Sequence, residues 1–118
     1  MNLTISHKNK KINLEVEKSI WLNPRGLMFT RREKAEILLF DFGKSVGRAI
    51  HSWFVFFPFL AVWLDDKNKI IEIKKVEPWR FCVHPKNKFF RLVEIPCSKK
   101  YEGFVKILIP RRGLEKFK

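Results

Sequence analysis

The sequence predicts a mainly β protein, either a small barrel or a two-sheet sandwich, with one or two short helices. Two observations lead to this prediction. Short runs of strand-forming residues recur along the 118-residue chain, and turn residues or prolines separate them. No segment keeps a helical period of apolar residues over several turns. The chain length suits one globular domain, and we expect residues 1–118 to form it.

The first expected element is a β-hairpin near the N-terminus. Leu3 and Ile5 alternate with polar residues, and Ile12, Leu14 and Val16 do the same. The polar sequence HKNKK lies between the two runs. This alternation with a polar centre predicts two antiparallel strands joined by a turn.

The next stretch is less regular. It is expected to contain one short helix before Pro24 and then a turn at Arg25-Gly26, where we expect Gly26 to adopt a backbone conformation that other residues resist. The sequence EILLFDF (36–42) predicts a strand, and GKSVGR (43–48) predicts the turn that ends it.

The most apolar stretch is IHSWFVFFPFLAVWL, residues 50–64. As a helix, residues 49–64 would reach about 24 Å, whereas a bilayer core needs about 30 Å. Pro58 would also interrupt such a helix. We therefore expect two buried strands, 50–57 and 59–64, and no membrane span. The expected core consists of Trp53, Phe54, Phe57, Val62, Leu64, Ile71, Ile73, Val93 and Ile95.

Three more strands are expected in the second half of the chain. The sequence DDKNK predicts a turn, and IIEIKKVEP after it predicts a strand that ends at Pro78. FFRLVEIP and FVKILIP predict two further strands, each stopped by a proline. In the last of these, Val105, Ile107 and Ile109 would share one face.

The chain is strongly basic, with 25 Lys and Arg against 12 Asp and Glu, a formal charge of +13 and a pI near 10.1. Such a surface attracts anions, including nucleic acid. Two facts weaken the interpretation of this charge as a nucleic-acid-binding surface. The basic residues are spread along the chain instead of forming one block, and the absence of glutamine indicates a thermophile-like composition. The first residues lack the apolar segment of a signal peptide, so we expect a cytoplasmic protein.

Cys82 and Cys97 are the two cysteines, and His84 lies two residues after the first of them. The spacing does not match a zinc site, so we expect no metal and no cofactor. A buried pair of free thiols is the favoured interpretation. A disulfide is the alternative if their strands pair.

The candidate binding residues mix arginine with aromatic and imidazole side chains. A guanidinium beside a ring can hold a phosphate and stack on a base. The alternative is that the arginines are solvated and the apolar neighbours pack inward. His51 has no local acidic partner, which favours a structural role over that of a catalytic base. The candidates are Arg25, Arg31, Arg32, Arg48, His51, Trp79 and Arg80.

An ordered set of short motifs resembles a known family. The set comprises RGLMF at 25–29, LF and Phe42 in the next strand, Pro58, Asp65, and EIP at 94–96. On these residues the chain resembles domain-of-unknown-function family one-nine-two, also called uncharacterised protein family zero-one-two-seven. The likeness covers roughly positions 14 to 96. It implies a compact, mainly β domain and no activity, because the function of that family is not established.

The chain also departs from the family pattern. Members commonly carry F-W-M-K-N-T before the proline and L-D after it. Residues 50–55 and 59–60 stand at those positions here. The polar lysine, asparagine, threonine and aspartate of the family are thus replaced by apolar residues, and a site built on that cluster would be lost. The Gly-Met that precedes L-F is replaced by Ile37 and Leu38.

These observations favour a non-enzymatic binding module for an anionic ligand or a protein partner. The alternative is a nucleic-acid-binding protein. An enzyme is the least favoured class, because the sequence lacks a recognisable catalytic motif and the polar cluster of the family.

Overall fold

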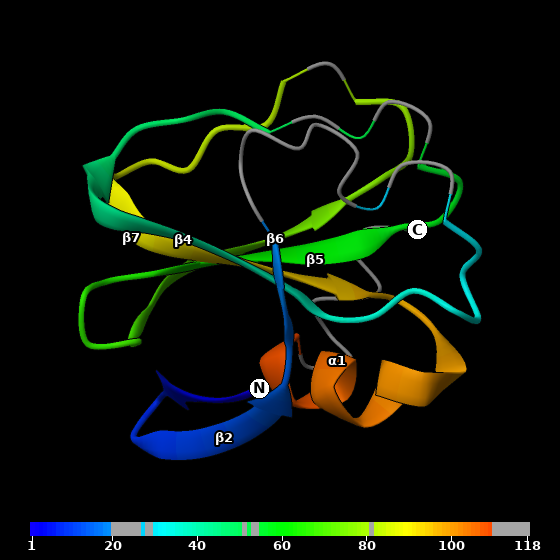
Figure 1. The fold of residues 1–118 in the computed structure, drawn as a ribbon, viewed down its shortest axis with the longest axis horizontal. Coiled ribbons are helices and arrows are strands. Elements are labelled where there is room, and N and C mark those ends of the chain that lie inside the picture. The colour runs from blue at the N-terminus through cyan, green and yellow to red at the C-terminus, as the bar shows by residue number, and fades with distance from the viewer. Residues whose placement is uncertain (20–26, 28–29, 51, 53–54, 81, 110–118) are drawn as a thin grey trace.

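The structure, a computed structural model, describes residues 1–19, 27, 30–50, 52, 55–80 and 82–109. It is mainly β, as predicted (Figure 1). A 3-10 turn, η1 (Lys99–Tyr101), leads into helix α1 (Glu102–Leu108). The strands are β1 (Asn2–His7), β2 (Lys10–Glu15), β3 (Glu17–Ser19), β4 (Leu38–Val46), β5 (Phe59–Leu64), β6 (Ile70–Val76) and β7 (Phe89–Pro96).

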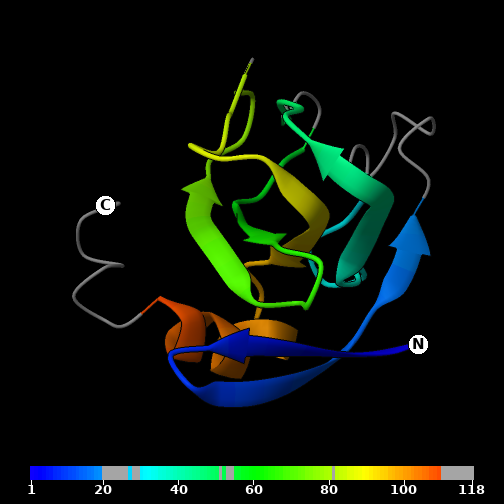
Figure 2. The same cartoon turned by 90° about the vertical axis from the view of Figure 1, so that its left-hand side faces the viewer.

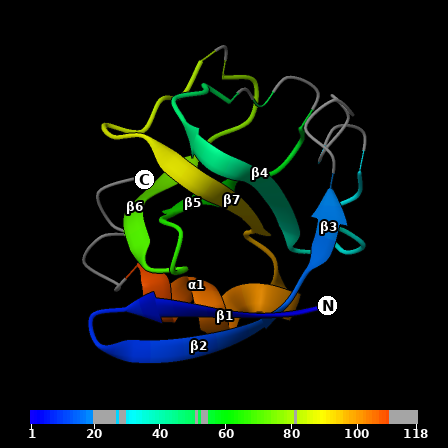
Figure 3. The ribbon, with the colours of Figure 1, turned by 60° about the vertical axis from the view of Figure 1, so that its left-hand side comes forward.

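The described strands form two sheets. β1 and β2 make a two-stranded sheet, and the other five make a sheet in the order β3-β4-β7-β5-β6. β3 runs parallel to β4, and the remaining neighbours are antiparallel. Figures 2 and 3 show the β1–β2 sheet beside α1, below the larger sheet. The described strands do not close into a barrel, so the arrangement agrees with the predicted sandwich.

The predicted N-terminal hairpin is confirmed. Leu3 pairs with Leu14, and Ile5 pairs with Ile12. All four side chains are buried, as the alternation requires. The turn residues Lys8 and Asn9 have positive φ values of 49° and 66°. Positive φ at both central residues is the signature of a type I′ turn, whose twist matches that of a hairpin.

Strand β5 is apolar throughout because both of its faces are covered. Its even-numbered residues contact one hydrophobic cluster and its odd-numbered residues contact the other. The first cluster also contains residues of β1, β2 and α1, so we call that side of the sheet the hairpin face. The second contains Leu27, Ile50 and Val55 from the connections between strands, and we call that side the loop face.

The predictions for residues 50–64 are confirmed only in part. β5 matches the second predicted strand, whereas the described residues of 50–57 form no strand beyond a bridge between Ile50 and Val83. Phe57 is buried as predicted, but Phe56 is 62% exposed. Trp53 and Phe54 lie outside the described residues. In the described segments, no helix has the length and apolar character that a membrane crossing needs.

Three further predictions are wrong. FVKILIP is not a strand, because residues up to Leu108 form α1, and Val105 and Leu108 pack on the hairpin face. Ile107 consequently points outward and is 52% exposed. GKSVGR does not end its strand, since β4 continues to Val46 through an irregularity at which Gly43 has φ +68°. Ile71 is 36% exposed because it lies on the edge strand β6, whereas Val62, Leu64, Val93 and Ile95 are buried and Ile73 is partly buried.

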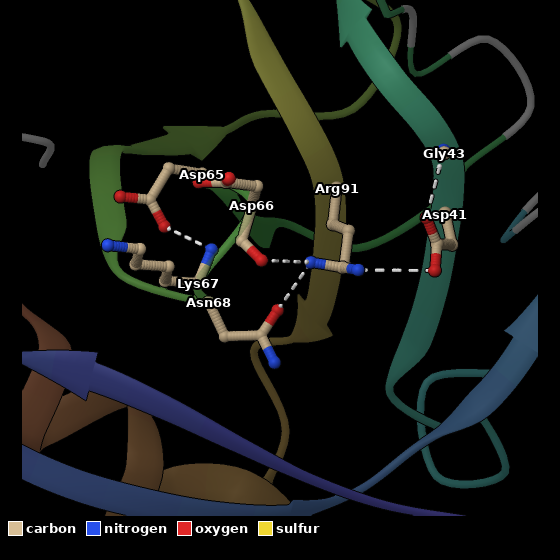
Figure 4. Close-up of polar contacts among 7 residues, drawn as sticks. All are labelled: Asp41, Gly43, Asp65, Asp66, Lys67, Asn68 and Arg91. Atoms are coloured by element: carbon tan, nitrogen blue, oxygen red, sulfur yellow. Dashed lines mark hydrogen bonds and ion pairs between the residues drawn. The ribbon is translucent and has the colours of Figure 1, made fainter.

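Arg91 on β7 joins three elements (Figure 4). Its Nε donates to Asp41 Oδ2 on β4 at 3.1 Å, and its Nη1 donates to the Asp66 carbonyl and to Asn68 Oδ1 in the β5–β6 turn. Burial alone would raise the pKa of Asp41, but hydrogen bonds from Gly43 N–H and Arg91 outweigh burial and lower that pKa. Arg91 thus links β4 and β7 to the turn between β5 and β6.

The Asp65-Asp66 pair belongs to a turn, as predicted. Asp65 Oδ1 accepts the backbone N–H groups of Lys67 at 2.8 Å and Lys69 at 2.9 Å. Asn68 supplies the positive φ of 62° that the tight turn requires. Asp65 therefore has a structural role here.

Candidate functional site

The candidate residues do not gather at one site. Arg31 and Arg32 lie on the β3–β4 connection, and Arg32 is next to η1. Arg48 lies on the β4–β5 connection, and Trp79 and Arg80 lie on the β6–β7 connection. Arg25 and His51, together with Gly26 and the helix expected before Pro24, fall outside the described residues. The arginine and aromatic set predicted from the sequence is therefore split between two parts of the molecule.

The first part is a groove of about 750 Å³ between the β3–β4 connection and the η1–α1 segment. Its charged walls carry four basic side chains and two acidic ones, a formal charge of +2 (four minus two). We call it the basic groove. Its lining residues are Arg32, Glu33, Cys97, Ser98, Lys99, Lys100, Glu102, Val105 and Lys106.

Two polar groups of the basic groove bear on ligand binding. Arg32 Nε donates to the Cys97 carbonyl at 2.7 Å, which fixes the plane of the guanidinium. Ser98 Oγ is buried and has no hydrogen-bond partner within the described chain. A buried hydroxyl without a partner costs free energy, and because Ser98 Oγ is closed to solvent, a ligand would have to displace the atoms that cover it to form a hydrogen bond.

The lysines of the groove differ in how far they are neutralised. Lys100 pairs with Glu36 at 2.8 Å, and Lys106 pairs with Glu102 at 3.1 Å. Hydrogen bonds from Lys100 and then Tyr101 lower the pKa of Glu36, so that carboxylate remains charged. Lys99 forms no ion pair with any residue that the structure describes. Arg32 and Lys99 therefore carry the positive charge that is left for a ligand.

The cysteines are free thiols, and the alternative of a disulfide is wrong for this structure. The prediction of a buried pair is also wrong, because Cys82 is exposed and Cys97 is half-buried. Burial raises the pKa of the Cys97 thiol, which keeps it protonated at neutral pH. Among the described residues, no group of three His, Cys, Asp or Glu side chains lies close enough to hold a metal ion. Cys82, His84 and Cys97 are therefore not brought together as ligands.

The second part is an exposed pair of rings on the connections that cover the loop face. The rings of Phe56 and Trp79 meet edge to face with centroids 5.8 Å apart. Phe56 is 62% exposed and Trp79 is 48% exposed. Trp79 has φ +63°, a conformation that costs a bulky residue about 1–3 kcal/mol. Surrounding contacts must therefore hold it.

Ser52 provides those contacts from a fully buried position. Its carbonyl accepts Trp79 N–H at 2.8 Å, and its own N–H donates to the Arg80 carbonyl at 2.9 Å. Its hydroxyl accepts Arg80 N–H at 2.7 Å and donates to the Glu77 carbonyl at 2.6 Å. We call this set of bonds the Ser52 junction. It fixes the turn at 77–80 and with it the position of the Trp79 ring.

A buried carboxyl group lies inside the loop face. Glu94 alternates with Val93 and Ile95, which contact the hairpin-face cluster, so its side chain points toward the loop face. Burial raises the pKa of Glu94 to about 8. Glu94 is paired with Ala61 on β5. Trp63 is its diagonal neighbour on the same face of that strand, and the buried Nε1 of Trp63 has no hydrogen-bond partner in the described part of the chain. The loop face thus encloses polar groups as well as apolar ones.

Sequence reasoning missed Ser98, Lys99, Phe56 and the burial of Glu94. Ser98 and Lys99 follow Cys97, whose carbonyl accepts a hydrogen bond from Arg32, 65 positions earlier in the sequence, and no local pattern reveals that proximity. Phe56 lies within an apolar run that predicted burial throughout. For Glu94 a signal existed. The wholly apolar β5 indicates a sheet covered on both sides, and a polar residue on the neighbouring strand would then be enclosed.

The fold and these features define a small, basic, mainly β protein of a class without an assigned activity. The chain belongs to the DUF192 family, described as an uncharacterised ACR, whose model matches residues 1–98. This confirms the resemblance drawn from the sequence. No match was found among the curated proteins.

Two solved structures share the fold. One is a protein of Sinorhizobium meliloti 1021 described as a "putative transcription regulator", with a TM-score of 0.69 and 22% identity over 89% of this chain and 81% of that one. The other is a protein of unknown function from Novosphingobium aromaticivorans DSM 12444, with a TM-score of 0.67 and 13% identity over 86% and 76%. At these identities the likeness concerns the fold alone.

Proposed function

We propose that this protein is a non-enzymatic binding domain that holds a small oxyanion ligand in the basic groove. The observation that carries the proposal is the presence of the Arg32 guanidinium and Lys99 in the lining of one groove, beside Ser98. Arg32 is held through Nε, and no described residue occupies its two terminal amino groups. Those groups form a fork that matches phosphate or carboxylate oxygens.

The size and charge of the groove support a small ligand. About 750 Å³ lies within the range of sites that take small molecules. The net positive charge of the walls attracts an anion, and Glu33 and Glu102 reduce that attraction without reversing it.

Binding is favoured over catalysis by the chemistry of the walls. Cys97 is the one thiol in the groove wall, and burial raises its pKa and suppresses the thiolate that a nucleophile needs. The lysines and Arg32 suit electrostatic recognition. Two free cysteines agree with a cytoplasmic location, which belongs to the same proposal.

We expect pyrophosphate or citrate to raise the melting temperature of the wild-type protein and to titrate with measurable heat. The double variant Arg32→Gln/Lys99→Gln should bind at least tenfold more weakly, because each charge-assisted hydrogen bond contributes about 1.5–3 kcal/mol. The measurement is isothermal titration calorimetry at fixed ionic strength. Pyrophosphate and citrate separate phosphate from carboxylate ligands.

The matched control is Lys10→Gln/Lys11→Gln on β2, which removes the same charge from exposed residues outside the groove lining. It should bind as the wild type does. The proposal is wrong if both double variants lose affinity equally, since the effect would then be that of net charge. It is also wrong if neither anion binds the wild type.

A further inference from the structure

We infer that the exposed Phe56–Trp79 pair is a stacking platform for the bases of a single-stranded nucleic acid. The two rings lie on the connections over the loop face, whereas α1, which lines the basic groove, packs on the hairpin face. The inference is thus independent of the proposed oxyanion site. It concerns a second surface and a different class of partner.

The first step is that the rings are held in place. The Ser52 junction fixes the 77–80 turn with four hydrogen bonds, two from the side chain and two from the backbone of a residue with no exposed surface. Ile50 and Val83 add two backbone hydrogen bonds at 2.9 and 2.8 Å between the same connections. Trp79 is therefore displayed by a rigid support, which lowers the entropy cost of binding to its ring.

The second step is that both rings are exposed. The neighbouring Val55 and Phe57 are buried in the loop-face cluster, and Phe56 between them is 62% exposed. Trp79 adopts a left-handed backbone conformation and stays 48% exposed. Both paired rings thus keep exposed surface, and a base can stack on an exposed ring face whatever its sequence.

The third step is the charge of the surroundings, which selects the partner. The described residues of the two connections, 47–58 and 77–88, carry Arg48, Arg80, Lys86 and Lys88 against one acid, Glu77, a formal charge of +3 (four minus one). Glu77 is itself paired with Lys75 at 3.5 Å. Figure 1 shows these connections together at the top of the molecule. Exposed rings among basic residues match the bases and phosphates of a single strand.

The test is fluorescence anisotropy of labelled oligomers of about ten nucleotides, dT and rU, at low and physiological salt. The wild type should bind both, with affinity that falls as salt rises. Phe56→Ala/Trp79→Ala leaves every charge in place and should bind at least tenfold more weakly. An abasic oligomer of the same length should bind the wild type about as weakly as dT binds this variant. A duplex, whose bases are already stacked, should bind the wild type and this variant with equal affinity.

The matched control is Ile107→Ala, which removes an exposed apolar side chain from α1 on the other face. It should bind as the wild type does. Phe56→Ala alone serves as the second variant, because a side chain that is 62% exposed contributes little to folding. This single variant should bind the oligomers more weakly than the wild type while its melting temperature is unchanged. Equal binding by wild type and ring variant, or equal binding of abasic and normal oligomers, overturns the inference. Failure of the wild type to bind at low salt also overturns the inference. The exposed rings would then be better explained as a contact surface for a protein partner.

Discussion

Replacing Glu94 by glutamine is expected to stabilise the protein at pH 8 and to remove most of the decline in its stability between pH 5 and pH 8. Burial raises the pKa of Glu94 in the folded protein to about 8, from an ordinary value of 4.5. Below pH 4.5 the carboxyl is protonated in both states and contributes nothing. Between these values the unfolded chain releases a proton that the folded protein keeps, so stability falls as pH rises.

The decline should level off above pH 8, where the folded protein ionises as well. The separation between 4.5 and about 8 corresponds to a loss on the order of 5 kcal/mol. Glutamine keeps the shape of the protonated acid and does not ionise. Urea unfolding of wild type and variant at pH 5, 6.5 and 8 measures the difference, and parallel pH curves would show that Glu94 is not the cause.

Glu36→Gln is the control of opposite sign. Hydrogen bonds from Lys100 and Tyr101 lower the pKa of Glu36, so its contribution is present above its ordinary pKa and is lost as pH falls. The variant should therefore be less stable than the wild type at neutral pH, and the difference should shrink toward acid pH. A stabilising effect of both variants at pH 8 would show that the gain does not come from the burial of Glu94.

Replacing Ser52 by alanine is expected to destabilise the protein by about 2–4 kcal/mol. The change removes the hydroxyl and leaves Arg80 N–H and the Glu77 carbonyl without the partner that they have now. Each buried backbone group left unpaired costs about 1–3 kcal/mol. The melting temperature should fall by roughly 10 °C, as measured by circular dichroism.

Ser45→Ala on β4 is the matched control for Ser52→Ala, because Ser45 is exposed. It should melt close to the wild-type temperature. The Ser52 backbone bonds survive in the alanine variant, so any loss reports the hydroxyl alone. A Ser52→Ala variant that melts with Ser45→Ala would mean that water replaces the hydroxyl and that the junction is not closed to solvent.

The strands that sequence predicted well are those whose limits are set locally. β5, β6 and β7 follow from runs of strand-forming residues with prolines or a polar turn at their ends. The hairpin follows from alternation around Lys8-Asn9. In these segments the local preference and the tertiary packing agree, and the pattern alone identifies the element.

The C-terminal helix was missed because two periods fit the same residues. Val105, Ile107 and Ile109 alternate as in a strand, yet Tyr101, Val105 and Leu108 are spaced as on one face of a helix. The β-branched residues favour the strand. Burial of Tyr101, Val105 and Leu108 in the hairpin-face cluster decides for the helix, and that burial depends on β1 and β2 at the other end of the chain.

The candidate site was predictable by residue type and not by location. Arg32, Trp79 and Arg80 were expected as binding residues, but their neighbours come from distant segments. Arg32 meets Cys97, and Arg80 meets Ser52. Which arginine meets which ring or hydroxyl is set by the order of strands in the sheet, and the sequence pattern does not contain that order.

The position of β7 in the sheet also constrains how the chain folds. β7 is the last of the described strands in sequence, yet it is the middle strand of the larger sheet and pairs with both β4 and β5. During synthesis only the β1–β2 and β5–β6 hairpins and the parallel β3–β4 pair are complete before it emerges. Leu38 therefore cannot pair until its partner Glu94, 56 positions later (94 minus 38), has been synthesised. Pairings of such long range slow folding, so we expect collapse of the sheet to be a late step that follows release of residue 96 from the ribosome.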